Sequence, residues 1–156
     1  MFRVSCIQLR SNNNIHQNLK KTEKLILRAV KQKADFILTP EVSSLFSLNK
    51  KQLLKTCKPM NKDEYLLGIK QLAKKYKKWI LIGSLIIKIS KNKLVNRSVL
   101  IDKKGKIRTY YDKIHMYDVV LSKKEKYFES KTFTAGKKIK SFNYPGVSLV
   151  YQFVMI

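Results

Sequence analysis

The longest apolar run in the chain extends from Trp79 to Ile87 and is interrupted only by Gly83 and Ser84. It is far shorter than the roughly 20 residues that a helix needs to cross a membrane. A continuous apolar run of this length is typical of a strand that is buried on both faces of its sheet. The run therefore predicts a layered protein in which other elements cover each face of a central strand.

The segments on either side of this run predict an α/β order. Residues 11–14 can cap an amphipathic helix in which apolar residues recur at intervals of three and four from Ile15 onward. A second helix can be opened by Asn61 and Asp63 and should reach Tyr76. Strands are expected at residues 3–9, 36–39, 79–89, 95–102 and 107–111, and residues 102–106, which contain Gly105, should form a hairpin turn between the last two. A sheet with helices on one face and a second sheet on the other satisfies this order and the doubly buried strand. Residues 43–60 show no clean period.

Three charged side chains stand out from this pattern. Glu41 follows a predicted strand and Pro40, a place where α/β proteins often position a functional group. Lys113 lies in an aromatic and apolar stretch, so its ammonium, if enclosed, must pair with a carboxylate. Glu129 follows Tyr127 and Phe128 in a basic neighbourhood. The alternatives are a surface Glu41, a Lys113 that reaches solvent along its stem, and a Glu129 that caps a helix or forms a surface ion pair.

The motifs that contain these residues resemble the nitrilase superfamily of carbon–nitrogen hydrolases, and most of all the omega-amidase branch. They are residues 2–8, Thr39-Pro40-Glu41, residues 111–116, and Glu129-Ser130 followed by Phe133 and Gly136. The order and approximate spacing match along residues 1–146. The resemblance implies a four-layer α-β-β-α sandwich, of which these residues are the N-terminal part, an incomplete half.

The resemblance also implies a chemistry and a set of partners. Glu41 would be the general base, Lys113 the cation that stabilises the tetrahedral intermediate, and Glu129 a second glutamate that positions Lys113 and the substrate. Intact relatives would act on small amides or nitriles other than peptide bonds, with no cofactor and no metal, and would pair into dimers across a helical face. The same roles make physical sense, because a thiol needs a base and an acyl intermediate needs a preorganised cation.

The chain departs from the family pattern at the nucleophile. The resemblance implies a cysteine shortly after the strand that begins near Pro145-Gly146, yet residues 147–156 contain none. Cys6 comes too early in the order, and Cys57 lies in the unassigned segment. We therefore expect no nucleophile at the site and no hydrolysis by the chain as written.

Residues 147–156 are interpreted as an aberrant tail. Permitted codons for Ser148 to Ile156, read from the third base, encode Phe-Gly-Leu-Ser-Ile-Cys-Tyr-Asp, the cysteine context that the family resemblance implies here. This pattern predicts a frameshift near Val147 and a truncated pseudogene product. A half-domain that works with a separately encoded second half remains open.

The formal net charge of +24, from 34 Lys+Arg and 10 Asp+Glu, raises a different function, namely a small basic nucleic-acid-binding protein. The lysines are spread from Lys20 to Lys140 rather than gathered in a block, which favours a solvated surface and leaves open non-specific binding to polyanions. The N-terminus has no apolar core of a signal peptide, so a cytoplasmic protein without a membrane partner is expected.

Overall fold

A central five-stranded sheet organises the protein. The computed structural model describes residues 1–144 and 147–151, with side chains as far as Phe142. The strand order in this sheet is β1-β2-β3-β4-β5, and the strands are β1 (Val4–Cys6), β2 (Phe36–Leu38), β3 (Trp79–Ser90), β4 (Lys93–Ile101) and β5 (Ile107–Asp112). All five predicted strands thus share one sheet, which confirms a mixed α/β fold, although β1 is shorter than expected.

The sheet has a parallel part and an antiparallel part. β1 pairs with β2, and β2 with β3, in parallel, as chain crossovers through helices require. β3, β4 and β5 form an antiparallel meander. The turn between β4 and β5 contains Gly105 at φ +74°, where a side chain would be strained. This is the glycine-containing hairpin that the sequence predicts.

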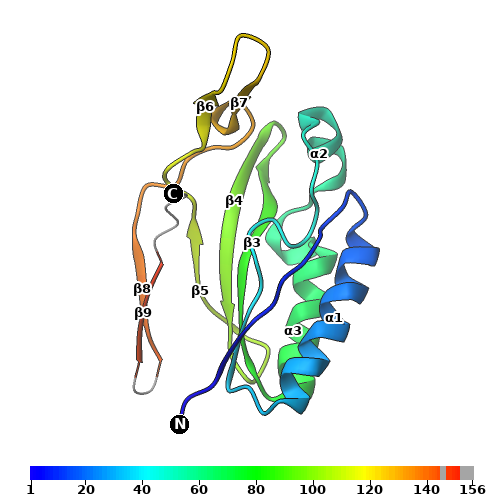
Figure 1. Ribbon diagram of the computed structural model, residues 1–156, viewed down its shortest axis with the longest axis vertical. Coiled ribbons are helices and arrows are strands. Elements are labelled where there is room, and N and C mark those ends of the chain that lie inside the picture. Colours follow the sequence, from blue (N-terminus) through cyan, green and yellow to red (C-terminus); the bar gives the residue numbers. More distant parts are fainter. Residues whose placement is uncertain (145–146, 152–156) are drawn as a thin grey trace.

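Two long helices cover one face of the sheet (Figure 1). α1 (Ile15–Lys31) begins at Asn14, whose side chain accepts a hydrogen bond from the Gln17 amide. α3 (Glu64–Tyr76) begins at Asp63, which accepts from the Leu66 amide, and follows a short 3-10 turn, η1 (Met60–Lys62). In the part of the chain that the structure describes, no helix has the length and apolar character needed to cross a membrane.

A third helix, α2 (Lys50–Thr56), was not predicted. It has only seven residues, and Leu53 is its buried side chain, so no period of three and four can develop within it. Asn49 caps it by accepting a hydrogen bond from the Gln52 amide. The helix and its flanking loops cover one end of the sheet, where Leu53 packs with Leu45 and Ile86.

The remaining strands form two hairpins. β6 (Asp118–Val120) pairs with β7 (Lys126–Phe128), and a 3-10 turn, η2 (Glu129–Lys131), follows. β8 (Lys140–Tyr144) pairs with β9 (Val147–Tyr151) on the side of the sheet away from the helices (Figure 1). The backbone of residues 147–151 is therefore a strand; residues 152–156, the remainder of the interpreted tail, lie outside the described residues.

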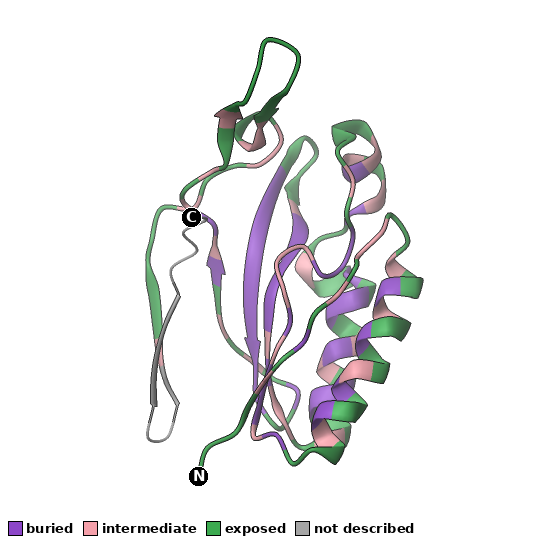
Figure 2. Ribbon diagram, in the orientation of Figure 1, coloured by how far each residue is buried: buried purple, intermediate pink, exposed green. Residues whose placement is uncertain are grey.

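The strand β3 is buried on both faces, as its apolar run predicts (Figure 2). Ile80 and Ile82 belong to the core under α1 and α3. On the opposite face, Phe36, Leu100 and Tyr111 form a smaller cluster with Trp79, against which Phe142 of β8 packs at a ring-centroid distance of 5.6 Å. The described chain thus contains a helical layer, a sheet and a two-stranded hairpin beyond it.

Candidate functional site

The position of Glu41 depends on a bulge in β3. The register between β3 and β4 shifts between Ile82 and Leu85, and the Gly83 amide donates to the Thr39 carbonyl at 3.1 Å. A Cβ on Gly83 would lie 2.2 Å from that carbonyl oxygen, so no other residue permits this approach. The glycine that interrupts the apolar run therefore holds the backbone immediately before Glu41.

Ser84 completes the attachment of this turn. Its Oγ accepts a hydrogen bond from the Val42 amide at 2.8 Å, and its carbonyl accepts one from the Ser43 amide at 2.9 Å. Val42 has φ +51°, a left-handed conformation that costs a β-branched residue about 1–3 kcal/mol. The bonds to Ser84 maintain this conformation directly beside Glu41.

Hydrogen bonds to both the backbone amide and the backbone carbonyl of Lys113 position this residue. Its amide donates to the Asn96 carbonyl of β4 at 2.9 Å, and its carbonyl accepts from the Gly136 amide at 2.8 Å. A Cβ on Gly136 would lie 2.1 Å from the Asp112 carbonyl oxygen. This close approach explains a glycine in the motif at residues 129–136. The same segment is tied to β4 by a hydrogen bond from the Thr134 amide to the Leu94 carbonyl at 2.8 Å.

Glu129 lies in η2, directly after the β6–β7 hairpin. Its amide donates to the Tyr117 carbonyl at 3.1 Å, and its Oε2 accepts from the Tyr117 amide at 2.7 Å. Its side chain is 13% exposed. Glu129 is thus fixed by the residue that precedes β6, and its carboxylate faces inward.

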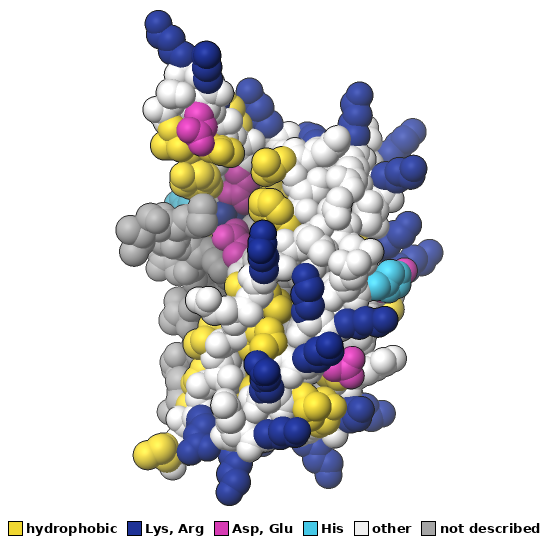
Figure 3. Space-filling view, turned by 45° about the vertical axis from the view of Figure 1, so that its right-hand side comes forward, with side chains coloured by type: hydrophobic (Ala, Val, Ile, Leu, Met, Phe, Trp, Pro, Cys, Tyr) yellow, Lys and Arg dark blue, Asp and Glu magenta, His cyan; other side chains and the backbone are white. Residues whose placement is uncertain are grey.

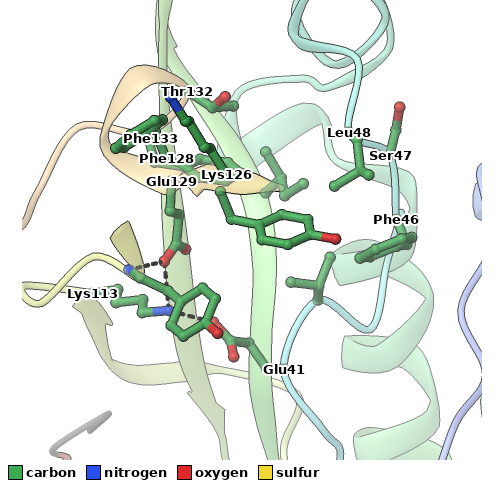
Figure 4. Close-up of a pocket in the computed structure, with 14 residues that line it drawn as sticks. Glu41, Phe46, Ser47, Leu48, Lys113, Lys126, Phe128, Glu129, Thr132 and Phe133 are labelled. Atoms are coloured by element: carbon green, nitrogen blue, oxygen red, sulfur yellow. Dashed lines mark hydrogen bonds and ion pairs between the residues drawn. The ribbon is translucent and has the colours of Figure 1, made fainter. Parts of the chain in front are cut away.

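The three predicted residues converge on one point (Figure 4). Lys113 Nζ lies 3.0 Å from Glu41 Oε1 and 2.8 Å from Glu129 Oε2, and its side chain is only 3% exposed. Burial on its own lowers the pKa of Lys113, but the hydrogen bonds and charges of Glu129 and Glu41 outweigh burial and leave the pKa above its ordinary value. The predicted convergence is confirmed, and Lys113 is a cation at neutral pH.

A fourth residue, Asn96 of β4, belongs to this cluster and was missed from the sequence. Its Nδ2 lies 2.7 Å from Glu41 Oε1 and 3.4 Å from Glu129 Oε1. The only sequence signal is a polar residue in the predicted strand at residues 95–102, where Arg97 and Ser98 are polar as well. That signal does not distinguish a site residue from a strand residue that faces solvent.

The cluster forms one end of a pocket of about 420 Å³. In a space-filling view, acidic side chains lie between hydrophobic ones at this part of the surface (Figure 3). The pocket wall is mainly apolar, with Ser47, Thr132 and Lys126 adding polar groups. Its lining residues are Glu41, Val42, Phe46, Ser47, Leu48, Ile86, Lys113, Tyr117, Lys126, Tyr127, Phe128, Glu129, Thr132 and Phe133.

Neither cysteine lines this pocket. Cys57 is buried beside Leu53, and burial, followed by the nearby charge of Asp63, raises its pKa to about 12, so its thiol is not ionised at neutral pH. Cys6 lies on β1 and is exposed. Among the described residues, no group of three or more His, Cys, Asp or Glu side chains has the arrangement of a metal site.

Comparison with known proteins places these features in a family. The family model described as Carbon-nitrogen hydrolase matches residues 3–154. The chain belongs to the carbon–nitrogen hydrolase family. This confirms the nitrilase-superfamily resemblance that the motifs around Glu41, Lys113 and Glu129 indicate.

Curated members of the carbon–nitrogen hydrolase family include amidase-like relatives. The chain is 29% identical to deaminated glutathione amidase of Yersinia enterocolitica, with 96% of this chain and 54% of that protein covered. It is 33% identical to citrullinase of Francisella tularensis, with 95% and 51% covered. The chain therefore spans about half the length of these curated relatives.

The fold matches solved structures of the same family. The NitN amidase from Nesterenkonia sp. AN1 superposes with a TM-score of 0.79 at 19% identity, covering 96% of this chain and 56% of that one. At this identity the match shows the fold alone. It agrees with the α/β arrangement of the five-stranded sheet and its helices.

Proposed function

We propose that residues 1–146 are the N-terminal part of a carbon–nitrogen hydrolase domain whose site acts on small non-peptide amides. Glu41 is the general base, Lys113 stabilises the oxyanion, and Glu129 positions Lys113. The observation that carries the proposal is the placement of Lys113 Nζ between Glu41 Oε1 and Glu129 Oε2 at the end of an apolar pocket. An ammonium held by two carboxylates in a pocket suits a substrate with a polar amide and an apolar chain.

The geometry supports separate roles for a thiol, Glu41 and Lys113 in amide hydrolysis. A thiol attacks the carbonyl carbon while Glu41 takes the thiol proton, and the proton then passes to the amide nitrogen as the C–N bond breaks and ammonia or an amine leaves. Water, activated by the same carboxylate, hydrolyses the thioester. An ammonium has three N–H donors, and two of those of Lys113 point at carboxylates, which leaves the third for the developing oxyanion.

These 156 residues supply the acid–base part of this chemistry without the thiol. Of the two cysteines in the sequence, Cys57 is buried with a raised pKa and Cys6 is on β1. The proposed consequence is a chain that binds small amides and does not hydrolyse them.

A binding and turnover experiment tests this function. Butyramide, followed by NMR, is expected to shift signals of pocket residues in the unaltered chain, while ammonia release stays at background. Lys113→Met should abolish binding. Lys126→Met is the matched control, because Lys126 lines the same pocket and, in the described part of the chain, its side chain forms no hydrogen bond or ion pair with Glu41 or Glu129. Butyramide binding that survives Lys113→Met, or turnover that disappears in Cys57→Ala or Cys6→Ala, contradicts the proposal.

A second candidate function, polyanion binding, is favoured by one groove. It has a volume of about 530 Å³ and lies between α1 and residues 8–10, and its lining contains cations and no acidic side chain. Its charged members are Arg10, Lys21, Lys24, Arg28 and Lys31. A row of cations without acids suits a phosphodiester backbone.

Charge reversal separates this groove from the general charge of the surface. The groove variant carries Lys21→Glu, Lys24→Glu and Lys31→Glu, and the control carries Lys70→Glu, Lys74→Glu and Lys75→Glu on α3, so that both lower the net charge equally. Fluorescence anisotropy with a single-stranded oligonucleotide should show weaker binding and a shallower salt dependence only in the groove variant. An equal loss in both variants means non-specific attraction and removes this candidate.

A further inference from the structure

We propose that Asn96 is a positioning residue of this site, which orients the Glu41 carboxylate. Its side-chain amide is an uncharged hydrogen-bond donor to a cluster in which two carboxylates share the single positive charge of Lys113. The inference rests on the proposed function, because the orientation of Glu41 matters for chemistry only if Glu41 acts as a base.

Asn96 contacts every member of the cluster. It is 2% exposed, and its backbone carbonyl accepts the hydrogen bond from the Lys113 amide. Its Nδ2 donates to Glu41 at 2.7 Å and lies 3.4 Å from Glu129. One residue on the rigid strand β4 thus fixes the backbone of the cation and the carboxylates on either side of it.

The charges of the cluster explain why a neutral donor suits this place. Two carboxylates share one ammonium, so the group carries one net negative charge. A second cation in place of Asn96 would neutralise that charge, an acid would add to it, and an apolar residue would leave the Glu41 carboxylate with one donor fewer. An amide donor satisfies the oxygen while the negative charge remains available to accept a proton.

The donors also distinguish the two oxygens of Glu41. Asn96 Nδ2 and Lys113 Nζ both bond to Oε1, while Oε2 accepts no hydrogen bond from the residues described. Oε1 is therefore held by two donors, and Oε2 remains the oxygen that can receive a proton from a nucleophile. This is the orientation that a general base requires.

The cost of this arrangement is visible on Asn96 itself. Its Oδ1 is buried and has no hydrogen-bond partner in the described part of the chain. Turning the amide over would bring Oδ1 against two carboxylate oxygens, so chemistry fixes the orientation with Nδ2 toward the acids. A buried acceptor without a partner destabilises the fold. Here the two hydrogen bonds from Nδ2 to the carboxylates hold the Asn96 amide in this orientation despite that cost.

The test follows the protonation of Glu41 in the chain without any ligand. The titratable and charged groups around Glu41 are Lys113, which is ion-paired with it, Glu129, which is ion-paired with the same ammonium, and Tyr117, Lys126 and Tyr127 on the pocket wall. With 13C-labelled glutamate, the side-chain carboxyl signal of Glu41 is followed against pH in the unaltered chain, in Asn96→Leu, and in Ser98→Ala. Ser98 is the matched control, since it is buried on the same strand and its Oγ donates to the Ile82 carbonyl instead.

Asn96→Leu is expected to raise the proton affinity of Glu41 about tenfold, because a donor to the charged form is lost, while Ser98→Ala leaves it unchanged. Asn96→Asp, which keeps the size of the side chain, should raise the proton affinity of the cluster at least as much and serves if the leucine variant does not fold. An unchanged Glu41 titration in the folded variants, or an equal change in Ser98→Ala, overturns the proposal. Failure of butyramide to bind the unaltered chain would instead count against the proposed function alone.

Discussion

Gly83 lies so close to Thr39 that a methyl group in place of its α-hydrogen would be 2.2 Å from the Thr39 carbonyl oxygen. This contact joins the bulge in β3 to the turn that carries Glu41, and the turn is tied on through two more bonds from Val42 and Ser43 to Ser84. The position of Glu41 thus depends on a close contact between the backbones of Gly83 and Thr39, which any side chain at position 83 would prevent.

Gly83→Ala is expected to destabilise the protein by about 2–4 kcal/mol, because the new Cβ must displace backbone rather than a flexible side chain. Chemical denaturation followed by circular dichroism measures the change. Gly68→Ala is the control, since its Cβ would meet only the movable end of Leu19, and alanine favours the helix. Equal stability of the two variants would mean that the Gly83 contact is not a structural requirement.

Lys113→Met should cost about 3–5 kcal/mol in the free energy of unfolding, because two carboxylates would remain in the cluster without their cation. Adding Glu129→Gln to this variant removes one of the charges and should recover part of the loss. Urea denaturation at pH 7 of the single and double variants gives the coupling energy. A Lys113→Met variant as stable as the unaltered chain would show that the ion pairs are not formed.

Asp63 gives the protein a specific pH dependence. It is buried at the start of α3, and burial is the main cause that raises its pKa from 3.8 to about 6. Because the folded state binds this proton more tightly than the unfolded state, the contribution of Asp63 to stability is complete below pH 4. It decreases as the pH rises from 4 to 6.

Asp63→Asn removes this dependence and keeps a capping side chain. The variant should therefore be more stable than the unaltered chain above pH 6, by up to about 3 kcal/mol, with the difference disappearing near pH 4. Denaturation midpoints measured from pH 4 to pH 8 check the sign. The predicted sign is wrong if the stability of the variant minus that of the unaltered chain is smaller at pH 8 than at pH 4.

The two thiols should differ in reactivity. Cys6 is exposed, whereas Cys57 is 3% exposed and has a pKa of about 12. Brief treatment of the folded chain with iodoacetamide at pH 7.5 should label Cys6 and leave Cys57 unmodified by mass spectrometry, and both should react in denaturant. Rapid labelling of Cys57 in the folded chain would reopen its candidacy as a nucleophile.

The gene decides the origin of residues 147–156. If a frameshift produced this segment, the shifted frame beyond the codons of Ser148 should encode Cys-Tyr-Asp and a continuing α/β sequence, which DNA sequencing would reveal. A separate downstream reading frame with its own start would instead support a second half supplied as another polypeptide. If neither kind of sequence lies downstream, residues 147–156 must have another origin.

Local sequence signals predicted most of the sheet and the charged members of the site. The apolar run of β3, the glycine turn before β5 and the caps at Asn14 and Asp63 each act over a few residues, so a single sequence reveals them. Asn96 could not be recognised in this way. Its importance comes from carboxylates that lie 55 and 33 residues away in the chain.

Other elements were missed for a related reason. The helix α2 is too short to show a period, and its existence depends on Leu53 packing against Ile86 of the distant strand β3. The predicted strand at residues 3–9 is paired only at Val4–Cys6, since β2, its partner, has three residues in the ladder. Tertiary contacts, rather than local preference, set these boundaries.

The division of the sheet into a parallel and an antiparallel part has a consequence for the order of assembly. The β3–β4–β5 meander joins segments that are neighbours along the chain, so its loops close at low entropic cost and it can form early. It brings Asn96 and Lys113 together by itself. Glu41 joins them only when β2 docks in parallel beside β3. The contact between Glu41 and Lys113 can therefore form only after this slower, non-local part of the sheet has assembled.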